Sequence, residues 1–277
     1  MKNFIIRLIT GALFVAIMVG AILYNPLSFG FLFALIAALT VFEFGVLVDN
    51  TGEVYISKIL SSLGAAYLFL AFMSCAMGTS SMKIFLPYLA FIIFMFIREL
   101  YLKRENPLGN WAYTMLSQMY IGLPFALLNL LAFQHDGISD TTSYNPIFPL
   151  SLFIFIWLND TGAYCIGTLF GRHRLFERIS PKKSWEGSIG GGIVCILASL
   201  ALGYFFPFMT YLEWIGLAIT IVVIGSWGDL VESLFKRQLG IKDSGTFLPG
   251  HGGFLDRFDS SLLAIPAAVI YLYAVIL

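Results

Sequence analysis

The chain has 277 residues, of which 59% are hydrophobic and 12% charged, with sixteen basic residues balancing sixteen acidic ones. Globular domains carry about 25% charged residues. With a mean hydropathy of +0.87, this composition therefore excludes a disordered chain, a disulfide scaffold and most water-soluble folds. The zero net charge argues neither for nor against nucleic acid, and we expect no nucleic-acid partner.

Long apolar stretches follow one another along the whole chain. A bilayer core needs roughly 20 apolar residues in a helix, and about nine stretches meet this requirement. The sequence therefore predicts an all-α polytopic integral membrane protein. The expected spans are Phe4–Tyr24, Ser28–Val48, Ile59–Met77, Ile84–Tyr101, Trp111–Phe133, Ile147–Phe170, Ile189–Phe206, Leu212–Val231 and Ser261–Leu277.

The basic residues indicate how these spans are oriented. With nine spans, fifteen of the sixteen Lys and Arg residues fall on one side, and only Lys83 falls on the other. Basic residues favour the cytoplasmic side, so we expect a cytoplasmic N-terminus and a C-terminus outside. The acidic loop Gln134–Asn145 fits the outer face.

Polar residues gather in the second half of the chain. We expect residues 1–135 to form helices that serve mainly as scaffold. Residues 146–277 would form the membrane region that holds the candidate site, with cytoplasmic loops at 171–187 and 232–259. An ionisable residue at membrane depth is costly and marks a candidate site. Asp160 and Asp229 are such residues, whereas for Glu43 we expect a structural role.

The stretch from Asp229 to Asp259 is the richest in polar residues. If the eighth span continues as a helix, Asp229 shares one face with Glu232, Ser233 and Lys236. Asp256 and Asp259 would share a face at the start of the ninth helix. The glycine-rich turn before that helix offers backbone N–H groups suited to phosphate. Carboxylates with nearby basic groups form sites for Mg²⁺ and phosphate.

A second basic segment precedes the seventh span. Ser180 is placed to cap a helix that would begin at Pro181, and Lys182 and Lys183 can meet phosphates. Upstream, Asp160 lies four residues before Tyr164, on the same helical face, and would project into the bundle interior.

These residues form a pattern that is similar to a known one. The run Ser233-x2-Lys236-Arg237-x4-Lys242-Asp243-x-Gly245-x3-Pro249-x-His251-Gly252-Gly253-x2-Asp256-Arg257-x-Asp259 resembles the signature of the phosphatidate cytidylyltransferases, also called CDP-diacylglycerol synthases. The runs Ser180–Gly187 and Asp160–Tyr164 also look like motifs of that family.

The resemblance implies transfer of CMP from CTP to phosphatidate, giving CDP-diacylglycerol and pyrophosphate in phospholipid biosynthesis. It also implies a homodimer in the inner cell membrane, with residues 1–135 as the dimerisation surface and residues 146–277 as the catalytic region. The active site would face the cytoplasm and require Mg²⁺ held by Asp229 and Asp256. Whether a second, monovalent cation also binds is left undecided. The implied catalytic residues are Asp229, Lys236, Arg237, Lys242, Asp243, Asp256, Arg257 and Asp259. The implied substrate-binding residues are Asp160, Ser180, Lys182, Lys183, Ser233, His251, Gly252 and Gly253.

Several of these residues also allow a purely structural interpretation, and the sequence allows other functions. Asp229 and Asp256 could be ion-pair partners of Lys236 and Arg257, and Asp160 could be a structural hydrogen-bonding residue. As rival functions, a transporter or channel would use acidic residues for an ion path. A CTP-dependent prenol kinase and an ether-lipid cytidylyltransferase are rivals among the enzymes, and a membrane scaffold is the least favoured alternative.

Overall fold

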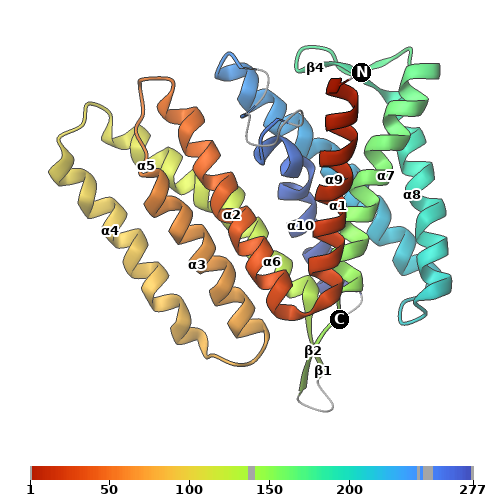
Figure 1. The fold of residues 1–277 in the computed structure, drawn as a ribbon, viewed down its shortest axis with the longest axis horizontal. Helices are drawn as coiled ribbons and strands as arrows, with labels where there is room; N and C mark the ends of the chain where they lie inside the picture. Colours follow the sequence, from red (N-terminus) through yellow and green to blue (C-terminus); the bar gives the residue numbers. More distant parts are fainter. Residues whose placement is uncertain (1, 137–140, 242–243, 246–251, 276–277) are drawn as a thin grey trace. The chain divides into compact units, whose positions relative to one another are not determined.

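The computed structural model describes residues 2–136, 141–241, 244–245 and 252–275, and most of these residues are helical (Figure 1). Within this part of the chain, eight helical segments are long and apolar enough to cross a membrane, and a shorter apolar helix covers Ile9–Tyr24. The prediction of an all-α polytopic membrane protein is therefore confirmed. The sides on which the two termini lie stay a prediction.

The elements follow one another with short connections in most places. Their order is α1 (Lys2–Tyr24), α2 (Pro26–Asp49), α3 (Lys58–Ala76), the 3₁₀ helix η1 (Met82–Phe85), α4 (Leu86–Leu102), α5 (Pro107–Leu116), the π-helical segment η2 (Ser117–Gly122), α6 (Leu123–Ala132), β1 (Phe133–Asp136), β2 (Thr141–Tyr144), α7 (Ile147–Phe170), β3 (Arg174–Phe176), β4 (Ser180–Ser184), α8 (Trp185–Phe205), α9 (Tyr211–Gln238) and α10 (Leu255–Val275).

The chain divides into two compact units. The first comprises residues 1–146 and 243–257, and the second comprises residues 147–242 and 258–277. The segment that carries most of the signature is thus shared between the units. The separate roles expected for residues 1–135 and 146–277 stay predictions.

In the first unit, α2 packs against α3, and α3 packs against α6. Asn25 caps α2, because its side chain accepts a hydrogen bond from the Ser28 amide at 2.8 Å, and Pro26 suits the first helical position. Phe29 and Phe69, with ring centroids 6.0 Å apart, are fully buried between α2 and α3. Aromatic packing thus fixes the helix pair that carries Glu43.

In the second unit, α7 and α8 lie side by side, and α8 packs against α9 (Figure 1). Glycines make the first of these contacts close. A Cβ atom added to Gly162 would come within 3.0 Å of the Gly191 Cα atom, and one added to Gly187 within 3.2 Å of the Gly167 Cα atom. Small residues at such positions let membrane helices approach each other.

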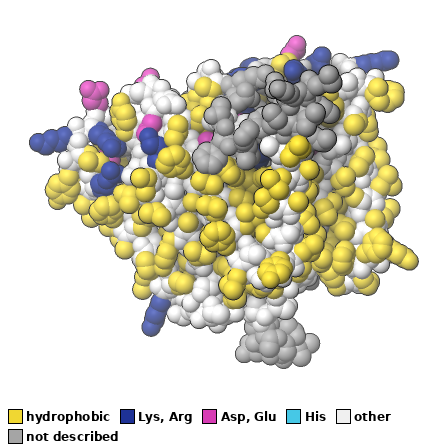
Figure 2. Space-filling model, in the orientation of Figure 1, with side chains coloured by type: hydrophobic (Ala, Val, Ile, Leu, Met, Phe, Trp, Pro, Cys, Tyr) yellow, Lys and Arg dark blue, Asp and Glu magenta, His cyan; other side chains and the backbone are white. Residues whose placement is uncertain are grey.

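Large apolar side chains remain exposed on the helices of both units. Figure 2 shows hydrophobic side chains over much of the face that it draws. The exposed apolar side chains include Leu89 and Ile93 of α4, Leu197 of α8 and Leu212 of α9. Exposed apolar surface on this scale is costly in water, and backbone groups satisfied within helices suit lipid. The chain is therefore an integral membrane protein.

The secondary structure differs from the sequence-based expectation at two antiparallel hairpins, β1–β2 and β3–β4. The expected helix beginning at Pro181 with Ser180 as its cap is wrong, because residues 180–184 form strand β4. Pro lacks a backbone donor but is tolerated at the edge of a sheet. The helix begins at Trp185 instead, and the capping residue is Ser184, whose hydroxyl accepts a hydrogen bond from the Gly187 amide at 3.2 Å.

The α7–α8 contact predicts different effects at two adjacent glycines. A Cβ atom at Gly191 would lie 2.6 Å from the Asn159 carbonyl oxygen, whereas one at Gly192 would meet only Val222 at 3.8 Å. We expect Gly191→Ala to destabilise the protein by about 1–3 kcal/mol and Gly192→Ala to have little effect. Thermal unfolding in detergent measures both, and equal melting temperatures for the two variants would contradict this packing.

Candidate active site

A cavity of about 580 Å³ lies in the second unit among α7, the β3–β4 hairpin, the start of α8 and α9. We call it the polar cavity, because carboxylate, basic, hydroxyl and amide side chains line it. They are Asn159, Asp160, Tyr164, Thr168, Arg174, Lys182, Lys183, Ser184, Ser188, Ser226 and Asp229. The sequence prediction placed Asp160, Lys182, Lys183 and Asp229 at one site, and the structure brings these four residues to the same cavity.

Helix α7 contributes one face to the polar cavity. Asp160, Tyr164 and Thr168 are spaced at i, i+4 and i+8, so they project from the same side of the helix. The Thr168 hydroxyl donates a hydrogen bond to the Tyr164 carbonyl oxygen at 2.5 Å. Since this donor is satisfied within the helix, Thr168 sits in an apolar segment at little cost.

Glycine residues, which expose their backbone, line the end of the polar cavity next to the hairpin. A Cβ atom at Gly171 would overlap the Gly167 carbonyl oxygen and come within 2.7 Å of the Ser184 hydroxyl, so only glycine fits there. Gly187, in the first turn of α8, also lines the cavity. The first amides of a helix lack intrahelical acceptors, and they favour a negative group nearby.

The charges of the polar cavity are paired across elements. Lys183 of β4 forms an ion pair with Asp229 of α9, and the Ser233 hydroxyl donates to the other Asp229 oxygen at 3.2 Å. Lys182, its neighbour in β4, is exposed. The hairpin therefore brings positive charge over a carboxylate that α9 supplies.

Helix α9 continues to Gln238, beyond the expected span, which meets the condition under which Asp229, Glu232, Ser233 and Lys236 share one face. Its final turns hold an ion pair of 2.6 Å between Lys236 and the buried Glu232. Arg237 donates to the Ile241 carbonyl oxygen at 3.4 Å. The suggested pairing of Asp229 with Lys236 is thus replaced by two pairs, Lys183 with Asp229 and Lys236 with Glu232.

The first unit holds the described part of the glycine-rich segment. Asp256 lies in the first turn of α10, and its Oδ2 atom accepts hydrogen bonds from the Ser244 amide at 2.9 Å and the Gly253 amide at 3.0 Å. Gly252 has a φ of 79°, which favours glycine. Arg257 is exposed, and its amide donates to the Phe254 carbonyl oxygen at 3.0 Å.

The other predicted site residues either are not among those that line the polar cavity or lie outside the described residues. Asp259 belongs to the second unit, and its Oδ1 atom accepts from the Ser260 amide at 2.5 Å. Ser180 lies in β4 and is not among the residues that line the polar cavity. Lys242, Asp243 and His251 lie outside the described residues.

Sequence reasoning gave no role to four polar residues that line this cavity, which are Thr168, Arg174, Ser188 and Ser226. Arg174 comes from β3, which the sequence did not reveal, and Ser226 lies three residues before Asp229 on α9. The i, i+3 spacing from Ser226 to Asp229 could have indicated a shared face. No comparable signal identifies Arg174, because the hairpin register decides which of several arginines faces the cavity.

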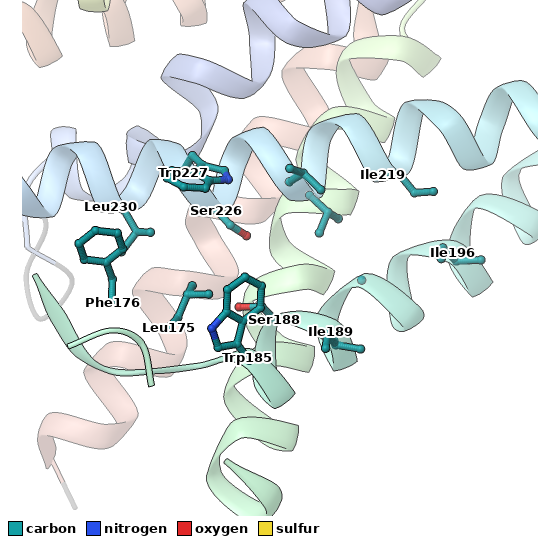
Figure 3. Close-up of a pocket in the computed structure, with 13 residues that line it drawn as sticks. Leu175, Phe176, Trp185, Ser188, Ile189, Ile196, Ile219, Ser226, Trp227 and Leu230 are labelled. Carbon is teal, nitrogen blue, oxygen red and sulfur yellow. The ribbon is translucent and has the colours of Figure 1, made fainter. Parts of the chain in front are cut away.

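An apolar groove of about 420 Å³ lies beside the polar cavity, between α8, α9 and the hairpin (Figure 3). We call it the apolar groove, and its lining is almost wholly hydrocarbon and aromatic. Ser188 and Ser226 line both spaces, so the groove and the polar cavity adjoin at these two hydroxyls. The other lining residues are Leu175, Phe176, Trp185, Ile189, Gly192, Ile196, Ile219, Val222, Val223, Trp227 and Leu230.

The polar cavity offers donors that suit a hard divalent cation. Two carboxylates, Asp160 and Asp229, line it together with the Asn159 amide. The Asn159 Oδ1 atom is buried and has no hydrogen-bond partner within the described ranges. Oxygen donors of this kind fit Mg²⁺, which one or two carboxylates usually hold while waters and substrate phosphates complete its shell. Among the described residues, no three or more Asp, Glu, His or Cys side chains are arranged so that they could hold a metal ion by themselves.

Known proteins are similar in sequence to this chain over long stretches. The sequence model of the cytidylyltransferase family matches residues 5–275. A phosphatidate cytidylyltransferase of Staphylococcus aureus (strain COL) is 43% identical over 162 residues, which cover 56% of this chain and 62% of the relative. The protein of the same name from Staphylococcus haemolyticus is 42% identical over 157 residues, 56% of each chain.

The aligned region spans about three fifths of these relatives' length, whereas the family match extends over almost the entire sequence. The chain therefore belongs to the cytidylyltransferase family.

Proposed function

We propose that this protein is a phosphatidate cytidylyltransferase, a membrane enzyme that transfers CMP from CTP to phosphatidate and releases pyrophosphate. One observation carries the proposal: a cavity with two carboxylates and three basic side chains adjoins an apolar groove at Ser188 and Ser226. A reaction between a nucleotide and a lipid phosphate needs charged and apolar surfaces side by side. The names of the similar staphylococcal proteins support the same substrates.

The reaction is a displacement at phosphorus. A phosphate oxygen of phosphatidate attacks the α-phosphorus of CTP, a new P–O bond forms, and the bond to the bridging oxygen of the leaving pyrophosphate breaks. A phosphomonoester has its second pKa near 6, so at pH 7 the attacking oxygen is already mostly deprotonated. The chain therefore needs no general base, and its task is to bring two anions together.

Positive charge in the polar cavity performs this task. Arg174, Lys182 and Lys183 come from the hairpin and can neutralise phosphate oxygens. The ion pair with Asp229 holds Lys183 in place before substrate arrives, so little reorganisation of this group is needed during the reaction. Positioning and electrostatics then account for catalysis, without a covalent enzyme intermediate.

Mg²⁺ is the cofactor in this proposal. When bound, it would stabilise the charge of the leaving pyrophosphate. The donors of the polar cavity that fit it are Asp229 and Asp160. We also propose Asp256 as a Mg²⁺ ligand, because it belongs to the signature. Whether an additional monovalent ion binds is an open question.

The setting of the enzyme is also part of the proposal. We infer that it is a homodimer in the inner cell membrane, with the polar cavity facing the cytoplasm, where CTP is found. The excess of basic residues in the loops expected on that side supports this orientation. The apolar groove would receive an acyl chain of phosphatidate, since its wall of Trp227, Ile189 and Val223 offers only apolar contact.

The purified protein, incubated with labelled CTP, phosphatidate and Mg²⁺, should form CDP-diacylglycerol and pyrophosphate in equal amounts, and a chelator should abolish the reaction until Mg²⁺ is restored. A CTP-dependent kinase would instead release CDP, and a transporter would form neither product. Either of those results would refute the proposed function.

Asp229→Asn should lower kcat by about 10²-fold or more, because it removes negative charge that a cation and Lys183 share in the polar cavity. Glu177→Gln is the control, since Glu177 is exposed and does not line this cavity. Steady-state assays and melting temperatures in detergent are measured together. A stable Asp229→Asn protein with wild-type kcat would remove Asp229 from the active site.

Gly192→Leu should fill part of the apolar groove and raise the KM for phosphatidate about tenfold, with the KM for CTP unchanged. The space exists, because a Cβ atom at Gly192 meets only Val222 at 3.8 Å. Ile193→Phe is the matched control, because Ile193 is exposed and does not line the groove. If both variants keep the wild-type KM for phosphatidate, the acyl chain binds elsewhere.

A further inference from the structure

Glu43 is a carboxylate within an otherwise apolar stretch of helix. It belongs to α2, and only 8% of its surface is exposed. An ionisable group at such a position is costly unless it is well hydrogen-bonded. The sequence alone favoured a structural role for Glu43, and its partners in the structure indicate more than that.

The hydrogen-bond donors to Glu43 lie about 200 residues further along the chain. The amides of Phe254 and Leu255 donate to its two oxygens at 2.8 and 3.2 Å. The Ser244 hydroxyl donates to the Oε1 atom. Since α10 begins at Leu255, the two amides belong to the helix start, where backbone donors lack intrahelical acceptors. Glu43 thus caps α10 from a different helix.

The glycines of this segment fit around the Glu43 carboxylate. A Cβ atom added to Gly253 would overlap the Glu43 Oε1 atom, and one added to Gly245 would lie 3.0 Å from Glu43 Cδ. A side chain at residue 253 would therefore displace the carboxylate. Two glycines of the signature thus have a structural explanation in the space that Glu43 occupies.

Ser244 connects Glu43 to Asp256. Its hydroxyl donates to Glu43 and accepts from the Asp256 amide at 3.3 Å. Its own amide donates to Asp256 Oδ2 at 2.9 Å, and the Gly253 amide donates to the same oxygen at 3.0 Å. The Asp256 carboxylate is therefore oriented by two backbone donors whose places depend on Glu43.

We propose that Glu43 is a positioning residue for catalysis, which acts through Ser244 and the start of α10 to fix the Asp256 carboxylate. This inference rests on the proposed function, in which Asp256 is a site residue. Glu43 is not among the residues that line the polar cavity, so it acts on the reaction through other groups. A residue that only capped α10 would affect stability, with no effect specific to turnover.

Two variants separate positioning from capping. Glu43→Gln weakens the whole set of contacts. Ser244→Ala removes only the hydroxyl that links Glu43 to the Asp256 amide, and it leaves the two amide bonds to Glu43 in place. Glu99→Gln is the matched control, because Glu99 is also buried in an apolar helix, α4, but its partners are Asn110 and Arg104. All three proteins are purified in detergent and compared with wild type.

The first measurement is amide hydrogen exchange, which does not depend on activity. Glu43→Gln should speed exchange at residues 252–256, and Ser244→Ala should speed it at Asp256, while Glu99→Gln should leave this segment unchanged. The second is steady-state kinetics with Mg²⁺ titration. Both test variants should lower kcat about tenfold or more and raise the half-saturating Mg²⁺ concentration, with the KM for CTP kept.

Faster exchange with wild-type kcat and Mg²⁺ dependence would overturn the proposal and leave Glu43 as a cap. Unchanged exchange in Glu43→Gln would also overturn it. A wild-type protein that forms no CDP-lipid would refute the proposed function and the effect on turnover with it. The exchange experiment would then still determine whether Glu43 holds the start of α10.

Discussion

A carboxylate placed in an apolar helix needs a polar partner, and this constraint organises both units. In the first unit, Glu99 accepts a hydrogen bond from Asn110, and Glu43 accepts hydrogen bonds from the start of α10. In the second unit, Asp229 is paired with Lys183 of the hairpin, and Glu232 with Lys236 on the same helix. Unpaired, each charge would be expensive. Where the partner comes from another element, the pair fixes a loop or hairpin that the apolar helices could not hold by hydrophobic contact alone.

Close helix approach is the second condition for the site. Glycines at the α7–α8 contact bring the two backbones together. Asp160 of α7 and Ser184, which caps α8, both line the polar cavity. In lipid, tight packing of small residues replaces the hydrophobic drive that assembles soluble helices. The glycines that stabilise the unit therefore also determine the width of the cavity, so packing and site geometry cannot vary independently.

The apolar groove lies next to the polar cavity in the second unit, so charged and hydrocarbon surfaces meet there. Charged groups cluster at one side of Ser188 and Ser226, and hydrocarbon side chains lie at the other. A phosphate ester of a lipid has the same division between its head and its tails. In the proposed function, this arrangement would let a single helix pair, α8 and α9, contact both parts of the lipid, and binding energy gained away from the reacting atoms would position the phosphate.

The membrane class, the approximate positions of the spans and the family could all be predicted from the residues alone, because apolar runs and motif spacing are local properties. Asp160 and Asp229 stood out in the same way, since charges in apolar helices are rare, and both line the polar cavity. The β3–β4 hairpin, which brings Arg174 and Lys183 to the cavity, became visible only in the folded chain, since hairpin register depends on pairing and not on helical period. The hydrogen bonds of Glu43 were likewise invisible in the sequence, because its partners lie about 200 residues away, and such contacts are formed by folding alone.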